Sequence, residues 1–203
     1  MAKRTKFEEL MEAEFRWPRL GDRPFIAAPD GRDNANVALN SRQRLVLMLE
    51  GYKHAGDLMV QSSERDSHLR DMLVFPVIFN YRQFVELSLK YQLSTYGRPV
   101  GIAANWNTHD LDILWTTFVE MLAKYGTPDP DEADPIIGEI VAEFSKIDPL
   151  SYSYRYPVDR RGNALPITYA DLHLPSLKDV MEAVANYFNG TDGYLSDLNA
   201  NGP

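Results

Sequence analysis

The sequence predicts a mainly α-helical fold, a bundle of four to five helices with a small β-hairpin before the last helix. Three observations support this prediction. Apolar residues recur at helical spacing over most of the chain from residue 41 onward. Capping residues, glycine and proline divide these stretches into helices of ordinary length. Residues 151–156 instead alternate tyrosine with other residues, which is typical of a strand.

The N-terminal part of the chain predicts an arm outside the bundle. Residues 2–14 are charged and can form a short helix, whereas residues 15–40 are rich in proline, glycine, asparagine and aspartate, which favours a loop. We therefore assign residues 1–40 to an N-terminal helix and irregular arm, and residues 41–190 to one helical domain. The polar residues 191–203 predict a flexible tail.

The first helix of the domain is expected to begin at Asn40 or Ser41, because both residue types are good N-caps. A second helix is expected over residues 69–93. It is apolar on two faces, which is typical of the central helix of a bundle. Pro76 lacks an N–H group, so this helix is expected either to kink or to begin there.

The third helix is expected to be capped by Thr108 and to end at Gly126, with acidic residues in its first turn. The fourth is expected to run from about residue 134 to residue 148, because a proline lies at its first helical position and another follows its end. A hairpin insertion over residues 151–169 and a last helix over about residues 175–188 complete the prediction.

Composition narrows the functional classes. The chain has 203 residues, a net charge of −8 and no cysteine. The length suits one domain, the charge repels phosphate backbones on average, and disulfide or thiolate chemistry is excluded. The longest apolar run, residues 72–79, is far shorter than the about 20 residues that span a bilayer. We therefore expect a cytoplasmic protein with no membrane association.

No cofactor and no metal site are predicted. The acidic segment 127–135 lacks the glycine and the final glutamate of a calcium-binding loop. Its three prolines favour a stiff acidic linker between two helices instead.

Arg82, Glu86 and Lys90 are four residues apart and therefore form a stripe along one side of the second helix. Arg82 and Glu86 share a face with apolar residues, and buried charges need partners. Two interpretations stay open: an internal ladder of ion pairs that fixes packing, or a polar cleft that binds a ligand. His109 stands where the third helix begins, and is a candidate general base or phosphate contact, or a residue that organises the helix start.

Two segments carry a family resemblance. Residues 82–93 follow the order Arg-x3-Glu-x2-Leu-Lys-x2-Leu, and His109 opens a His-Asp-Leu helix start. This combination resembles the HEPN superfamily. The resemblance implies a helical bundle, often dimeric, that cleaves RNA in toxin–antitoxin or phage-defence systems, binds nucleotides, or serves as an inactive partner. It would place His109, Arg82 and Glu86 in a catalytic site, with Lys90 among the binding residues.

The family's active ribonucleases carry an Arg-x4-6-His motif. None of the histidines of this chain follows an arginine at that spacing. The departure argues against metal-independent RNA cleavage and leaves open whether the chain is an enzyme.

The predicted hairpin holds the most basic local patch of the chain. Tyr154, Arg155 and Tyr156 are followed in the turn by Arg160 and Arg161. Aromatic and arginine side chains together can stack on bases and hold phosphates. The alternative is that the tyrosines pack on the bundle and the arginines are solvated.

The sequence thus leaves two main functional hypotheses. The first is a HEPN-like protein that binds or acts on RNA or a nucleotide, linked to stress or phage defence. The second is a non-catalytic helical module that forms a homodimer or binds a protein partner. A cleft that gathers Arg82, Glu86, His109 and Arg155 would favour the first, and dispersal of these groups would favour the second. A small-molecule pocket under the hairpin is a third hypothesis.

Overall fold

The computed structural model describes residues 18–129, 132–148, 154–159 and 161–201. The chain divides into two units, Met1–Ala38 and Leu39–Pro203. In the first unit, the described residues 18–38 form turns without helix or strand, as expected for an irregular arm. The helix predicted over residues 2–14 lies outside the described residues.

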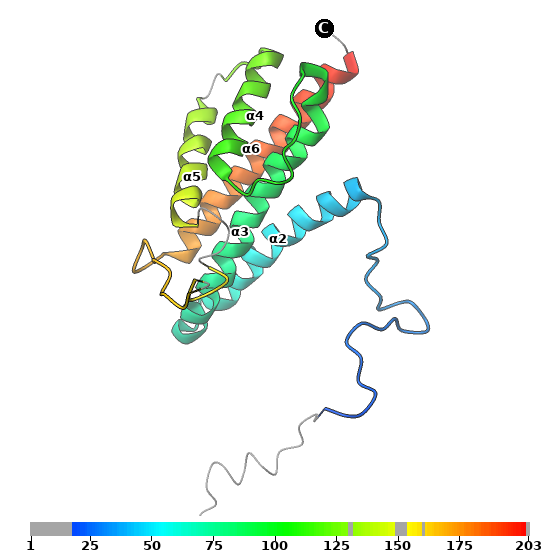
Figure 1. The fold of residues 1–203 in the computed structure, drawn as a ribbon, viewed down its shortest axis with the longest axis vertical. Coiled ribbons are helices and arrows are strands. Elements are labelled where there is room, and N and C mark those ends of the chain that lie inside the picture. Colours follow the sequence, from blue (N-terminus) through cyan, green and yellow to red (C-terminus); the bar gives the residue numbers. More distant parts are fainter. Residues whose placement is uncertain (1–17, 130–131, 149–153, 160, 202–203) are drawn as a thin grey trace, which may run out of the picture. The chain divides into compact units, whose positions relative to one another are not determined.

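The second unit is a helical bundle, which confirms the predicted fold class (Figure 1). Its described helices are α2 (Ser41–Ser63), α3 (Ser67–Tyr96), the 3-10 turn η1 (Arg98–Val100), α4 (Leu111–Tyr125), α5 (Ala133–Ile147) and α6 (Leu174–Asn201). The central position predicted for the second helix is confirmed, because α3 packs against α2, α4 and α6. No helix in the described part of the chain combines the length and the apolar character that a membrane crossing needs.

The helix ends follow the predicted capping residues with two exceptions, at the starts of α4 and α5. α5 begins at Ala133, with Glu132 as its N-cap, so Pro135 is the third helical residue and not the first. The Asn40 side chain accepts a hydrogen bond from the N–H of Gln43 and caps α2. Gly126 adopts a left-handed backbone, with φ of 66°, and ends α4. The N-cap of α4 is Asp110 rather than Thr108, because the Asp110 carboxylate accepts from the helical N–H of Ile113. The Thr108 hydroxyl instead accepts the N–H of Asp110, one step before the helix.

Two helices are longer than predicted. α3 starts before Pro76 and continues through it, so the proline does not begin the helix. α6 runs to Asn201 instead of ending at residue 188, and the flexible tail expected over residues 191–203 is helical wherever it is described. The physical reason is burial: Leu195 is fully buried, and the Tyr96 hydroxyl donates a hydrogen bond of 2.6 Å to the Asp192 carboxylate.

The predicted hairpin is reduced to its turn. Asp159 accepts hydrogen bonds from the backbone N–H groups of Arg161 and Asn163, which organise a turn where one was expected. A single antiparallel bridge joins Val158 to Ala164. The described part of residues 151–169 contains no strand beyond this bridge. Residues 154–155 are a turn rather than part of a strand, and residues 151–153 lie outside the described residues.

The core surrounds α3. Val77, Tyr81, Val85 and Leu89 of this helix are fully buried. They are covered by apolar side chains of the other helices, among them Val60, Phe118, Met121, Val141, Met181 and Val184. A helix enclosed in this way carries its polar side chains into the interior as well, which creates the network described next.

Candidate functional site

Three charged side chains lie inside the bundle along α3. The Glu86 carboxylate accepts a hydrogen bond from Arg82 Nη1 at Oε2 and one from Lys90 Nζ at Oε1. Each N–O distance is 2.9 Å. No more than 3% of any of these three side chains is exposed. The spacing of four residues brings them into a row, so one buried carboxylate is shared by two cations.

Arg82 ties two loops to α3. Its Nε donates to the main-chain carbonyl of Asp148, at the end of α5, over 2.8 Å. Its Nη2 donates to the main-chain carbonyl of His109, before α4, over 2.7 Å. The Asp148 carboxylate lies 3.9 Å from Nε and is itself buried. Because the guanidinium is fully buried and directed at these oxygens, it holds the bundle together and does not reach a ligand in solvent.

Lys90 is placed similarly. Its ammonium group lies 3.5 Å from the main-chain carbonyl of Trp106 and 5.8 Å from the centre of the Trp106 ring. Together with Glu86, these contacts fasten the loop before α4 to the C-terminal half of α3. The two cations that the family resemblance assigned to a site are therefore engaged with protein oxygens.

We call Arg82, Glu86, Lys90 and His109 the charged network. Of these four residues, only His109 has an exposed side chain. Its Nδ1 lies 2.8 Å from Glu86 Oε1, while 59% of the side chain is exposed. A carboxylate at Nδ1 favours the tautomer with the proton on that nitrogen, which leaves the Nε2 lone pair as an acceptor. The arrangement can present an oriented imidazole at the surface, either as a base or as a hydrogen-bonding group.

The environment of Glu86 lowers its pKa. Burial raises the pKa of this carboxyl, but the hydrogen bonds from Lys90, His109 and Arg82 and the positive charge of Lys90 outweigh burial, so its pKa falls below the ordinary 4.5. Glu86 is consequently ionised at neutral pH. One anion between two cations, with the Asp148 carboxylate beside them, leaves little net charge in the network.

The residues of the predicted hairpin form a separate site. Tyr154, Arg155 and Tyr156 line a hollow of about 380 Å³ together with apolar residues that include Phe75 and Ile167. Burial raises the pKa of the Tyr154 hydroxyl, and the nearby Asp148 and Tyr169 raise it by smaller amounts. This hydroxyl has no hydrogen-bond partner among the described residues.

Arg155 lies over two aromatic rings, and one of them, Tyr156, also lines this hollow. Its guanidinium carbon lies 5.6 Å from the Phe79 ring and 5.9 Å from the Tyr156 ring. Tyr154 is buried and Tyr156 is 49% exposed, so these two tyrosines do not share one environment as they would on one face of the predicted strand. Arg161 is exposed in the turn, and Arg160 lies outside the described residues.

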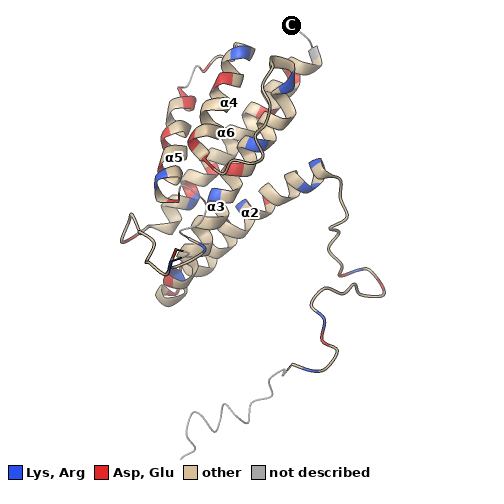
Figure 2. Ribbon diagram, viewed as in Figure 1, with Lys and Arg blue, Asp and Glu red and all other residues tan. Residues whose placement is uncertain are grey.

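The structure therefore brings together Arg82, Glu86, Lys90 and His109, whereas Arg155 lies over the rings of Phe79 and Tyr156. The hollow beside Arg155 is not lined by any of the four network residues. Lys and Arg are interspersed with Asp and Glu along the helices of residues 39–203, without a long basic stripe in the described part (Figure 2).

The sequence analysis missed residues that contribute through the main chain or from distant helices. The carbonyls of Trp106 and Asp148 leave no signal in the sequence, because every residue type carries the same main-chain oxygen. Only the backbone conformation decides which carbonyl is used. A second ion-pair cluster was also missed: Lys53 of α2 lies 2.7 Å from Asp57 and 2.9 Å from Glu182 of α6. The spacing of Lys53 and Asp57 on one helix could have suggested their pairing, but the partner on α6 could not be found locally.

Comparison of the chain with protein-family models, with curated proteins and with solved structures finds no match in any of the three.

Proposed function

We propose that this chain is a HEPN-like helical module that works by binding a partner and not by cleaving RNA. One observation carries the proposal: Arg82 and Lys90, the cations of the HEPN-like motif, are buried and bound to Glu86 and to main-chain carbonyls. Stabilisation of a phosphate in a transition state needs donors aimed at the developing charge. Donors that already hold the fold together cannot be redirected without unfolding the loops they anchor.

The surface of α2 supports a binding role. Leu47 and Leu58 are 58% and 49% exposed, and their spacing of eleven residues, about three helical turns, places them on one face of the helix. Exposed apolar side chains that share a helix face favour helix–helix association. We take the partner to be a second copy of the chain, in line with the dimers that the family resemblance implies.

A cleavage assay tests the non-catalytic half of the proposal. Single-stranded RNA is incubated with the purified full chain and with the His109→Ala variant, each with and without EDTA, after circular dichroism has shown that both are folded. We expect intact RNA in all four reactions. Cleavage that survives EDTA and is lost in His109→Ala would overturn the proposal and make His109 the base of a metal-independent ribonuclease.

Sedimentation equilibrium tests the association half. We expect the wild-type chain to dimerise and Leu47→Glu and Leu58→Glu to weaken the dimer, because each would bury a charge in the interface. Ile136→Glu, on the exposed face of α5 where Ile136 is 57% exposed, is the matched control and should leave the dimer intact. A monomeric wild-type chain at every concentration would exclude the homodimer.

A second candidate function is RNA or nucleotide binding at the hairpin segment. It is favoured by the stacking of Arg155 on aromatic rings beside an open hollow, an arrangement that can also take a base. Binding of a fluorescent oligonucleotide would weaken in Arg155→Ala and at higher salt if this function holds. Equal binding by wild type and Arg155→Ala would exclude the site.

A further inference from the structure

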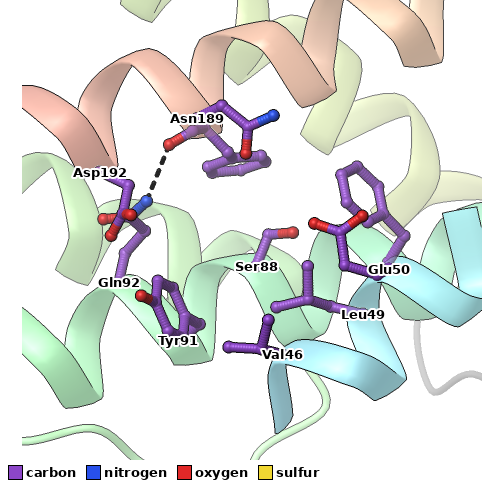
Figure 3. Close-up of a pocket in the computed structure, with 10 residues that line it drawn as sticks. Val46, Leu49, Glu50, Ser88, Tyr91, Gln92, Asn189 and Asp192 are labelled. Carbon is purple, nitrogen blue, oxygen red and sulfur yellow. Dashed lines mark hydrogen bonds between the residues drawn. The ribbon is translucent and has the colours of Figure 1, made fainter. Parts of the chain in front are cut away.

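A small pocket lies between α2, α3 and α6 (Figure 3). At about 100° of rotation per residue, its α3 residues fall on the face opposite Arg82, Glu86 and Lys90. Its volume is about 90 Å³, which is room for about three water molecules at the ~30 Å³ that each occupies in the liquid. The lining residues are Val46, Leu49, Glu50, Phe84, Ser88, Tyr91, Gln92, Phe188, Asn189 and Asp192.

Two buried oxygen atoms in this pocket lack a hydrogen-bond partner among the described residues. They are Ser88 Oγ and Gln92 Oε1, on side chains that are 3% and 1% exposed. The orientation of the Gln92 amide is fixed, because its Nε2 donates to the main-chain carbonyl of Phe188 over 3.0 Å and a rotated amide would set two oxygens against each other. A buried polar atom without a partner is costly. Gln92 Oε1 can only accept, so it calls for a donor, and the Ser88 hydroxyl can accept from the same group.

The polar lining favours a cation. Glu50 and Asp192 contribute carboxylates, and none of the ten described lining residues is Lys or Arg. In Figure 3 the Ser88 hydroxyl and the Glu50 carboxylate point into the space between the helices. Acceptors therefore outnumber donors, and the local charge is negative.

The apolar lining favours a short hydrocarbon stem. Phe84, Tyr91 and Phe188 supply aromatic rings, and Val46 and Leu49 supply aliphatic walls. Aromatic faces also attract ammonium groups. The size, the acceptors and the rings together describe one chemical class.

We propose that this pocket binds a small primary amine in its ammonium form. The ammonium group donates hydrogen bonds to Ser88 Oγ and Gln92 Oε1, with Glu50 and Asp192 balancing its charge. The alkyl stem lies against the aromatic and aliphatic walls. None of the network residues lines the pocket, so the proposal stands apart from the proposed function.

The test is titration of the full chain with n-propylammonium chloride, followed by the backbone and side-chain amide signals in ¹⁵N-correlated nuclear magnetic resonance spectra. We expect saturable shifts at the Gln92 side-chain amide and along the pocket-lining parts of α2, α3 and α6. Propan-1-ol tests the role of charge and tetramethylammonium tests the role of N–H donors, and both should bind more weakly. Sodium chloride at equal ionic strength should produce no saturable shift.

Variants separate the specific site from general attraction to an acidic protein. Ser88→Ala should weaken binding by about tenfold, because it removes an acceptor for a charged donor. Glu50→Gln should weaken it by about two- to fivefold, since Glu50 is exposed and its charge is screened. Glu139→Gln, an exposed carboxylate on α5, is the matched control and should bind as the wild type does.

Three results would overturn the proposal. They are the absence of saturable shifts in the wild-type chain, equal affinity of Ser88→Ala and wild type, and binding of propan-1-ol as tightly as the amine. The first would mean that water alone satisfies Ser88 and Gln92. The second would place the amine elsewhere, and the third would mean that the pocket recognises only the apolar stem.

Discussion

His109 and Glu86 form a contact between an exposed ring and a buried carboxylate, with 2.8 Å between Nδ1 and Oε1. The same carboxylate oxygen accepts from Lys90, and the other accepts from Arg82. Glu86 is therefore the shared partner of Arg82, Lys90 and His109. Its removal is therefore expected to destabilise the fold strongly.

Glu86→Gln is expected to lower the free energy of unfolding by about 3–5 kcal/mol, because it leaves two buried cations without their anion. Guanidinium denaturation followed by circular dichroism measures the change. The control is Glu120→Gln, whose partner Lys124 forms an exposed pair at 2.9 Å and which should cost less than about 1 kcal/mol. Similar losses in the two variants would contradict a structural role for Glu86.

The pH dependence of the same loss follows from the lowered pKa of Glu86. A lowered pKa in the folded state stabilises the fold fully above the ordinary value of 4.5, and this stabilisation disappears as the pH falls through the folded-state pKa. The difference in unfolding free energy between wild type and Glu86→Gln should therefore be largest near neutral pH and shrink below about pH 4.5. Denaturation curves over this range test it, and a difference that stays constant with pH would contradict it.

Two glycines of α2 form a matched pair with opposite predicted effects. A Cβ atom at Gly56 would lie 2.6 Å from Cε1 of Tyr81, a buried ring whose hydroxyl donates to Asp57, so Gly56→Ala should destabilise by about 1–3 kcal/mol. A Cβ at Gly51 meets no atom within 4 Å, so Gly51→Ala should stabilise by up to about 1 kcal/mol through helix propensity. Thermal unfolding measures both, and a stabilised Gly56→Ala variant would contradict this packing of α2 on α3.

The last turns of α6 can be tested at neighbouring positions. Leu195 is fully buried, so Leu195→Ala should cost about 2–5 kcal/mol through lost contacts and the cavity left behind. Tyr194 is 43% exposed, and Tyr194→Ala should change stability by only about 0.5 kcal/mol. Urea denaturation distinguishes them. Equal, small effects would mean that residues beyond 190 do not pack against the bundle.

Local signals in the sequence were sufficient for much of the fold. Asn40 and Gly126 act within one turn of their own position, so their capping roles depend little on the rest of the molecule. The spacing of Arg82, Glu86 and Lys90 likewise fixed their proximity. Whether they formed an internal ladder or an open cleft depended on burial, which is set by α4, α5 and the loops and cannot be read from one helix.

The errors have physical causes as well. Gly190 and Gly193 obscured the helical spacing of Phe188 and Leu195, although both of these residues are buried on one side of α6. In the hairpin, the alternation around Tyr154 gave a strand signal, but β-propensity mainly reflects packing, and Tyr154 obtains its packing from Phe75 of α3, 6.2 Å away between ring centres.

The way Arg82 holds its loops has a consequence for how this chain can change over evolutionary time. The guanidinium recognises the main-chain carbonyls of residues 109 and 148, which every amino acid provides. The anchor therefore does not depend on which amino acid stands at position 109, where 59% of the side chain is exposed. Descendants of this chain can exchange that side chain and acquire a different surface chemistry there, while the loop keeps its place on the bundle.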